Sequence, residues 1–541
     1  MSNLHTIGGV PGPGRIGRVA AGDILHRSAR RFPERVAIVE GERRTTYAEL
    51  DRSANRFAHY LLASGLEPGT RVTTACNNST DFVTCIFGIL KAGMVWVPIN
   101  TMLGIEDARY ILQHSEAALA VVDDDIYDNP EKRALFDSQR TPVIVNVVTG
   151  SSTKGGESTL SQVLQGQPDI EPEVDIQDRD LAIIMYTSGT TSRPKGAMHC
   201  HLSIVFSAFN NALEWRLDRS DALTCVLPLF HCAQHAILNY TLLVGAKAVV
   251  QRGFDVEELM RSVEREQITV SILLPMMYAA ILDHPRRAQH NLQSLRLCIW
   301  GMAPMPKDLT VRLVNEICPN FVLGSGQTEM YPSTTLSRPD RTLKRFGNYW
   351  GESTVVNETA IMDDAGNVLP PGQIGEIVHR GPNVMMGYYK DPAATQAARA
   401  FGWHHTGDLA LVDEYGELLF IDRKKDLIKS GGENVSSVKV EEALLTHPAV
   451  LRSAVVGLPH PHWGEAVAAF VMLKPGETAG EEAIIEHCKR LLGGFQVPKR
   501  VRFLDDIPMT ASGKVRKTEL KASHLNLFVD TSTVGDHSHQ Q

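Results

Sequence analysis

Apolar and polar residues alternate along this chain in blocks that predict short buried strands separated by amphipathic helices. Between residues 47 and 64 the apolar side chains of Leu50, Phe57 and Leu61 recur at helical spacing. Further helices are expected at 23–31, 81–91 and 200–214. Short apolar runs bounded by Gly, Pro or polar residues predict strands at 36–39, 71–75, 95–99, 181–185, 222–227, 246–250, 269–274, 295–299 and 321–323. This order predicts an α/β protein with largely parallel sheets.

The pattern changes in the last third of the chain. Residues 124–180 are already less regular, and beyond Glu376 short strands and Gly turns replace the alternation. A dense charge cluster at 422–426 marks the expected boundary and hinge between an N-terminal domain, residues 1–422, and a C-terminal domain, residues 426–541. The C-terminal part is long enough for a small α+β domain.

Composition narrows the class of protein. A chain of 541 residues is too long for one ordinary core, and 43% hydrophobic and 21% charged residues are typical of a soluble globular protein. The net charge of −8 argues against nonspecific nucleic-acid binding. No stretch approaches the ~20 apolar residues of a membrane span, and the first residues lack the apolar core of a secretory signal. Eight scattered cysteines without a CxxC pattern favour a reducing cytoplasm and free, mostly buried thiols.

The strongest candidate for chemistry follows the apolar run 181–185. Small and hydroxylated residues come next, followed by Lys195 and Gly196. Such a loop presents backbone N–H groups and hydroxyls to a polyphosphate, and the lysine adds positive charge. The pattern is not a Walker A loop, because Pro194 precedes the lysine and a glycine follows it.

This loop and four later motifs resemble the conserved motifs of the adenylate-forming superfamily. The superfamily includes acyl-CoA synthetases, firefly luciferases and peptide-synthetase adenylation domains. The later motifs occur in the family's order, and the five cover nearly the whole chain. They lie at residues 324–329 (GSGQTE), 403–408 (WHHTGD), 422–434 (DRKKDLIKSGGEN) and 508–517 (PMTASGKVRK). The resemblance implies a large N-terminal domain of two doubly wound subdomains plus a small distorted β-barrel, and a small mobile α+β C-terminal domain.

The resemblance also implies roles for individual residues. Thr328 would hold the α-phosphate, Glu329 would bind Mg²⁺ with Thr187 as a second ligand, and Lys514 would be the catalytic lysine. The implied nucleotide and cofactor residues are Thr187, Ser188, Gly189, Thr190, Thr191, Lys195, Gly301, Ala303, Gln327, Asp408, Arg423, Lys425, Lys429, Gly431 and Gly432. Among these, Asp408 and Arg423 would hold the ribose, and Lys425 would be the hinge. Gly431 and Gly432 would enter the site for the second half-reaction.

The chain departs from the family in two places. Ser325 stands where an aromatic residue usually stacks on adenine, and residues 346–352 depart from the usual glycine-rich stretch.

His231 and His235, spaced i and i+4, invite a zinc interpretation together with His199 and His201, but the glutamate of HExxH is missing. The resemblance instead places His231 beside the acyl pocket, as a candidate base for the thiol.

The implied function is an ATP-dependent acyl-CoA synthetase that uses ATP, Mg²⁺ and coenzyme A on a small carboxylic acid, with a fatty or medium-chain acid favoured. Loading of an acyl carrier protein, and activation of an aryl acid or another oxyanion such as nitrite, remain alternatives. An inactive nucleotide-binding relative is the rival from another class, against which the retention of Lys514, Glu329 and Asp408 speaks. A homodimer remains an open alternative to a monomer.

Overall fold

The computed structural model describes residues 17–139, 141–149, 158–187, 193–301, 305, 307–337, 348–509 and 515–528, and the backbone of the two short strands β1 (Thr6–Ile7) and β2 (Val10–Pro11). Statements about structure below concern these residues. Six of the predicted site residues lie outside them: Ser188, Gly189, Thr190, Thr191, Ala303 and Lys514.

The first sheet has seven strands in the order β20-β10-β9-β6-β5-β7-β8. Its strands are β5 (Arg71–Ala75), β6 (Val95–Pro98), β7 (Leu119–Asp123), β8 (Val143–Asn146), β9 (Leu181–Thr187), β10 (Lys195–Cys200) and β20 (Gly387–Tyr388). The strands from β9 to β8 in this order are parallel, whereas β10 pairs antiparallel with β9 and β20. Helices near it are α1 (Asp23–Arg31), α2 (Tyr47–Ala63), α3 (Thr80–Lys91), α4 (Ile105–Ser115), α5 (Asp124–Tyr127), α6 (Pro130–Gln139) and α7 (Leu160–Leu164).

The second sheet has thirteen strands in the order β18-β19-β21-β22-β17-β16-β15-β14-β13-β11-β12-β3-β4. Its parallel part comprises β3 (Val36–Glu40), β11 (Ala222–Cys225), β12 (Lys247–Val250), β13 (Val270–Leu273), β14 (Leu297–Trp300) and β15 (Phe321–Ser325). Its antiparallel strands are β4 (Arg43–Thr46), β16 (Thr335–Ser337), β17 (Asn348–Ser353), β18 (Glu358–Met362), β19 (Gly375–Arg380), β21 (His404–Val412) and β22 (Leu418–Arg423). Further helices here are α10 (Val256–Glu266), α11 (Pro275–Leu282), α12 (Lys307–Glu316) and α14 (Pro392–Ala397).

Two apolar helices, α8 (His201–Glu214) and α9 (Cys232–Val244), join the two sheets. One continuous buried cluster includes residues of both sheets and both helices, among them Trp96, Ile183, Ile204, Leu223, Leu238 and Ile272. Burial on several sides explains why α9 shows apolar residues around most of its circumference. The two sheets therefore share one core.

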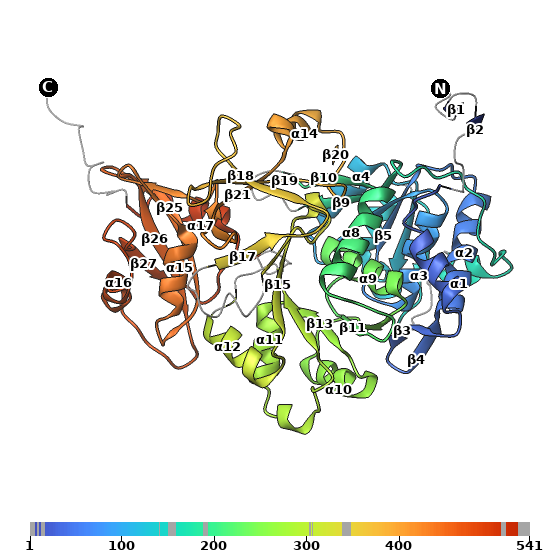
Figure 1. Cartoon of the computed structure of the whole chain (residues 1–541), viewed down its shortest axis with the longest axis horizontal. Coiled ribbons are helices and arrows are strands. Elements are labelled where there is room, and N and C mark those ends of the chain that lie inside the picture. Colours follow the sequence, from blue (N-terminus) through green and yellow to red (C-terminus); the bar gives the residue numbers. More distant parts are fainter. Residues whose placement is uncertain are drawn as a thin grey trace.

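The C-terminal part forms its own sheet, coloured orange to red in Figure 1 and lying at the opposite end of the molecule from the first sheet. Its strands are β23 (Ile428–Ser430), β24 (Glu433–Val435), β25 (Val450–His460), β26 (Gly464–Leu473) and β27 (Arg500–Phe503). Its helices are α15 (Ser437–Leu445), α16 (Glu481–Lys489) and α17 (Lys517–Ser523). The prediction of a mixed α/β fold with a large N-terminal and a smaller C-terminal domain is confirmed.

Several sequence predictions need correction. The phosphate loop does not lead straight into a helix, because Lys195–Cys200 first returns as β10 beside β9. Residues 124–180 contain α5, α6, β8 and α7, and the continuous run of antiparallel strands in the second sheet begins at β16, well before Glu376. The prediction of free, mostly buried thiols is confirmed, since all eight cysteines are buried free thiols. Among the described residues no helix has the length and apolar character needed to cross a membrane.

Candidate active site

Thr328 and Glu329 lie in a short 3-10 turn, Thr328–Met330, just beyond the end of β15. The Thr328 carbonyl accepts a hydrogen bond of 2.8 Å from the Nε2 of His199 on β10, and the Thr328 hydroxyl lies 3.4 Å from the Cys232 thiol at the start of α9. Burial lowers the pKa of His199 to about 4, so this imidazole is neutral near pH 7. Both the sheet and the helix therefore fix the turn.

The Glu329 side chain is held by one neutral donor. The Tyr388 hydroxyl donates a hydrogen bond of 2.9 Å to Glu329 Oε1, and the Lys195 ammonium lies 5.1 Å from the centre of the Tyr388 ring. Burial, with the neighbouring Glu329 charge, raises the pKa of Tyr388, which keeps its hydroxyl protonated as a donor. No Lys or Arg pairs with the Glu329 carboxylate in the described part of the chain, so its charge fits a hard cation such as Mg²⁺.

Gln327, Asp408 and Arg423 form a cluster on the same side of the second sheet. Gln327 Nε2 donates to Asp408 Oδ2 at 2.9 Å, and Arg423 Nε lies 3.8 Å from Asp408 Oδ1. Asp408 and Arg423 are partners in the antiparallel pair β21–β22, which places their side chains together. A buried carboxylate held by an amide and a guanidinium is suited to accept sugar hydroxyls.

The predicted phosphate loop is the connection of the β9–β10 hairpin. Thr187 and Lys195 face each other across it, and the Thr187 hydroxyl donates to the Lys195 carbonyl at 3.4 Å. The residues between them that carry predicted roles lie outside the described part. Gly301 follows β14 of the second sheet, and a Cβ there would lie 2.7 Å from the Gly324 carbonyl, so only glycine fits.

His231 caps the N-terminus of α9, and its Nδ1 accepts a hydrogen bond from the Ala233 amide at 3.4 Å. One turn further, His235 Nδ1 shares a hydrogen bond of 2.5 Å with the Tyr331 hydroxyl. Burial lowers the pKa of His235 to about 3. These histidines thus serve separate neutral hydrogen bonds, which offers no support for a shared zinc ion.

Geometry suggests a different metal-like group, at His26, Asp51 and Glu171, in the described part of the chain. The fully buried Lys91 ammonium lies 2.8 Å from Asp51 and also pairs with Glu171. A lysine already neutralises these carboxylates, so the group is a structural ion-pair network.

The segment after Arg423 brings the predicted hinge and glycine loop together. Burial lowers the pKa of Lys425 in the turn between β22 and β23. The Lys429 amide donates to Glu465 at 2.9 Å, and the Gly431 amide donates to the Trp463 carbonyl at 2.9 Å. Gly431 and Gly432 have φ of +60° and +87°, a backbone conformation that favours glycine.

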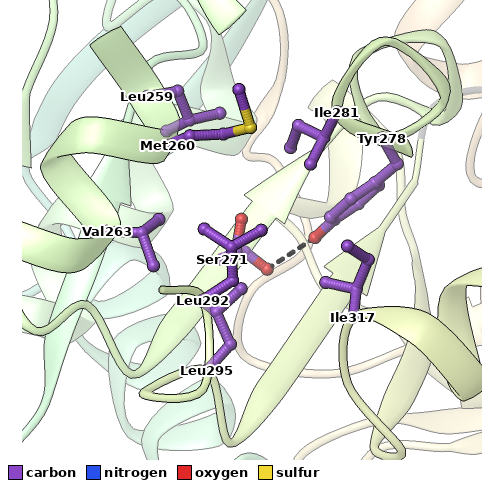
Figure 2. Close-up of a pocket in the computed structure, with 9 residues that line it drawn as sticks. All are labelled: Leu259, Met260, Val263, Ser271, Tyr278, Ile281, Leu292, Leu295 and Ile317. Atoms are coloured by element: carbon purple, nitrogen blue, oxygen red, sulfur yellow. Dashed lines mark hydrogen bonds between the residues drawn. The ribbon is translucent and has the colours of Figure 1, made fainter. Parts of the chain in front are cut away.

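The described part of the structure contains two hollows that differ greatly in volume. The first, of about 10 Å³, lies among apolar side chains of α10, α11 and neighbouring segments, where the Tyr278 hydroxyl bonds the Ser271 carbonyl (Figure 2). It is a packing gap that excludes a substrate. The second, of about 580 Å³, is an open cleft lined by Met198, Met386, Tyr388, Lys390 and residues of α14. It shares Tyr388 with the candidate site.

The sequence analysis missed Tyr388 and Trp463, and it named His199 only as a possible zinc ligand. Tyr388 is 59 residues from Glu329, and His199 is 129 residues from Thr328. No local pattern links such pairs. Gly387 and Tyr388 form the edge strand β20 beside β10. Two consecutive tyrosines follow Gly387, and this pair is the sequence feature that could have drawn attention to Tyr388.

The comparisons with known proteins define the class. Residues 25–389 match the family model described as AMP-binding enzyme, and residues 439–514 match AMP-binding enzyme C-terminal domain. The chain belongs to this family, and thus to the adenylate-forming superfamily. It is an acid–thiol ligase of the acyl-CoA ligase kind.

Individual relatives align over nearly their whole length. Feruloyl-CoA synthase of Amycolatopsis sp is 34% identical over 496 residues, which are 92% of this chain and 97% of the relative. Long-chain-fatty-acid–CoA ligase FadD13 of Mycobacterium tuberculosis is 31% identical over 511 residues, covering 93% and 98%. The crystal structure of ATP-bound MatB from Rhodopseudomonas palustris is 28% identical with a TM-score of 0.84, covering 94% of this chain and 100% of MatB.

Proposed function

We propose that the protein activates a carboxylic acid with ATP as acyl-AMP, releases pyrophosphate, and transfers the acyl group to coenzyme A. The observation that carries this proposal is the convergence of Thr328 and Glu329, in the turn after β15, with the Gln327–Asp408–Arg423 cluster, whose last two residues lie on β21 and β22. Phosphate, metal and ribose groups of ATP would each find a chemically matched partner there. The names of the relatives, all ligases acting on organic acids, support the same reaction.

In the first step a carboxylate oxygen attacks the α-phosphorus of ATP, and the bond to pyrophosphate breaks with its electron pair. Both reactants are anionic, so fixed positive charge must offset their repulsion. Lys195 at the start of β10 and Lys514 in the C-terminal motif would supply it. Glu329, with Thr187, would hold Mg²⁺, which when bound neutralises phosphate charge.

In the second step the thiol sulfur of coenzyme A attacks the acyl carbon, and AMP leaves. A thiol with a pKa near 8.5 is mostly protonated at neutral pH, so its proton needs an acceptor. His231, at the N-terminus of α9, is the proposed acceptor, and its unprotonated ring nitrogen is Nδ1, which accepts a hydrogen bond from the Ala233 amide. The glycines 431 and 432 would let the pantetheine arm approach the backbone closely.

We assign the orientation of the C-terminal domain in this structure to the first step. The chain superposes on ATP-bound MatB with a TM-score of 0.84 but on apo MatB with 0.75, although sequence identity is the same within one percent. The second step would require rotation about Lys425, which withdraws Lys514 and brings in the glycine loop. The domain limits 1–422 and 426–541 belong to this proposal.

We propose that the carboxylic acid substrate is a fatty or medium-chain acid. This proposal is supported by the exposed apolar side chains of Phe206, Phe209 and Leu213, spaced along α8. Pyrophosphate release should be measured with a panel of medium-chain, long-chain and aryl acids and with nitrite. Each active acid is then tested with coenzyme A and with a carrier protein. Absence of pyrophosphate release with every acid would support the inactive relative.

A further inference from the structure

The interdomain linker is tied to Lys517, the first residue of α17, by an internal hydrogen-bond chain. The Lys517 ammonium donates to the Ser437 hydroxyl at 2.6 Å, and the Ser437 hydroxyl donates to Asp422 Oδ2 at 2.7 Å. Asp422 is the residue before Arg423 at the end of β22, and Lys517 lies three residues after Lys514. The chain therefore spans from the ribose cluster to the catalytic-lysine motif.

Both ends of this chain are firmly held. The Lys517 ammonium also lies 2.8 Å from Glu441 Oε1, and that oxygen accepts a hydrogen bond of 2.8 Å from the Val455 amide of β25. Although burial alone would lower it, the carboxylates of Glu441 and Asp422 raise the pKa of Lys517, so the lysine stays charged. Asp422 and Ser437 are almost completely buried, which shields these bonds from water.

The hydrogen bonds cross the linker. Asp422 precedes the proposed hinge residue Lys425, whereas Ser437 and Lys517 follow it in the C-terminal sheet unit. A second bond crosses at the same place, from the Ser436 hydroxyl to the Ile421 carbonyl at 2.7 Å. On the upstream side, Lys424 pairs with Asp364 at 2.6 Å and Glu376 at 3.2 Å, which fixes it to the N-terminal unit. A rotation about Lys425 would thus separate Asp422 from Ser437.

We propose that Lys517, Ser437 and Asp422 are positioning residues that hold the Lys514 loop in place for the first half-reaction only. The proposal rests on the proposed function above, since it presumes two half-reactions. In this orientation the hydrogen bonds tie Lys517, three residues after Lys514, to the strand that carries Arg423. In the rotated orientation the contact is absent, so the second half-reaction does not depend on it.

The decisive variant is Ser437→Ala, which removes the hydroxyl relay but keeps the amide of residue 437 as a donor. Hydrogen bonds to charged groups are strong enough that a loss of about tenfold in the rate of acyl-adenylate formation is expected. Thioester formation from supplied acyl-adenylate should stay within about twofold. The matched control is Ser453→Ala, which loses a bond of 3.3 Å to the Glu441 carbonyl without crossing the linker, and should leave both rates unchanged.

A charge series tests the lysine. Lys517→Met should slow adenylate formation at least as much as Ser437→Ala, and Lys517→Arg should restore most of it. Ser437→Ala keeps the proposal testable if Lys517→Met fails to fold. Equal loss of both half-reactions, selective loss of thioester formation, or no effect of Ser437→Ala would each overturn the proposal.

A second readout is independent of catalysis. The Ser437 amide donates to Asp422 Oδ2 across the linker, so Asp422→Ala should speed hydrogen exchange at residue 437 while the Val440 amide, bonded within α15, keeps its protection. Unchanged exchange at residue 437 would contradict the crossing bond itself. Failure of the proposed function alone would instead appear as absent pyrophosphate release in the parent protein with this exchange pattern intact.

Discussion

The Tyr388 hydroxyl donates a hydrogen bond of 2.9 Å to the Glu329 carboxylate, joining the edge strand of the first sheet to the turn that follows the parallel part of the second. Its partner is a neutral donor, so the bond places no positive charge beside the carboxylate. The bond also uses one oxygen and thereby orients the other. Tyr388 therefore acts as a positioning residue for the candidate magnesium ligand.

Replacing Tyr388 by Phe removes this bond and leaves the ring against which Lys195 lies. We expect the rate of adenylate formation to fall about tenfold, in line with one hydrogen bond to a charged group. The apparent Mg²⁺ affinity should weaken as well. Tyr389→Phe is the matched control, and a magnesium titration of pyrophosphate exchange is the measurement. Identical titrations for the parent and Tyr388→Phe would remove this residue from the site.

Glu329→Gln tests the metal ligand directly. The amide keeps the shape and can still accept from Tyr388, but the charge is lost. Adenylate formation should slow by about 10² or more, as for the loss of one charge-stabilising group. The matched control is Glu358→Gln, which removes a carboxylate at the exposed first residue of β18. An unchanged rate and magnesium dependence would show that another residue holds the metal.

Local sequence patterns predicted the elements whose burial alone decides their structure. The apolar runs at β6, β9 and β14 lie in sheets covered on both faces, so hydrophobicity suffices to find them. The strand β10 was missed because its sequence, KGAMHC, has neither a continuous apolar run nor clean alternation. It forms by pairing with β9, and that information is not local.

The candidate site shows the same division. Motif residues such as Thr328 and Asp408 could be named from the sequence through the resemblance, and the structure places them near one another. The contacts that orient them could not. Asp422 and Ser437 are 15 residues apart, and Lys517 is 80 residues from Ser437. These residues come into contact only through the packing of the C-terminal sheet, and hydrophobic periodicity in the sequence carries no information about that packing.

Lys514→Ala tests the assignment of the catalytic lysine. The loss of positive charge beside the carboxylate and α-phosphate should abolish detectable acyl-adenylate formation. Thioester formation from supplied acyl-adenylate should survive, because the lysine is withdrawn during that step. Lys499→Ala, a lysine on another segment of the C-terminal unit, serves as the control. Parallel loss of both half-reactions in a folded protein would argue against alternating orientations.

The carboxylate of Glu266 allows a prediction about how the stability of the protein depends on pH. Hydrogen bonds from Arg44, at 2.7 Å and 2.9 Å, lead the effects that lower the pKa of Glu266 to about 2 from an ordinary 4.5. A lowered pKa contributes stability that is present above the unfolded value and lost as pH falls through the folded value. The shift corresponds to about 3 kcal/mol, lost between about pH 4.5 and pH 2.

Glu266→Gln should therefore lower the melting temperature at pH 7, and the difference from the parent should shrink steadily as pH falls through that window. Thermal melts between pH 7 and the lowest pH at which both proteins remain folded measure it. Glu264→Gln, the neighbour two residues earlier with a largely exposed side chain, is the control. A difference that is constant with pH would assign the effect to packing.

Lys425→Pro is the sharpest test of the two-step mechanism. Proline fixes φ near −65° and removes an N–H, so a residue that must adopt two backbone conformations can keep only one of them. The upstream neighbour Lys424 is fixed to Asp364 and Glu376, and the downstream strand β23 belongs to the C-terminal sheet. The backbone change of a rotation therefore falls on residues 425–427. The Lys425→Pro variant should therefore keep adenylate formation and lose thioester formation.

Pyrophosphate exchange and thioester formation should be measured separately on the same preparation. Neither the phosphate hairpin nor Lys514 is altered, so the KM for ATP should change little. Lys424→Pro is not a suitable control, because its amide donates to the Gly407 carbonyl at 2.8 Å. Lys425→Ala, which removes the side chain but leaves φ free, is the matched control and should retain both half-reactions. If Lys425→Pro supports full thioester turnover, the pivot lies at Asp426 or Leu427, or the domain does not rotate.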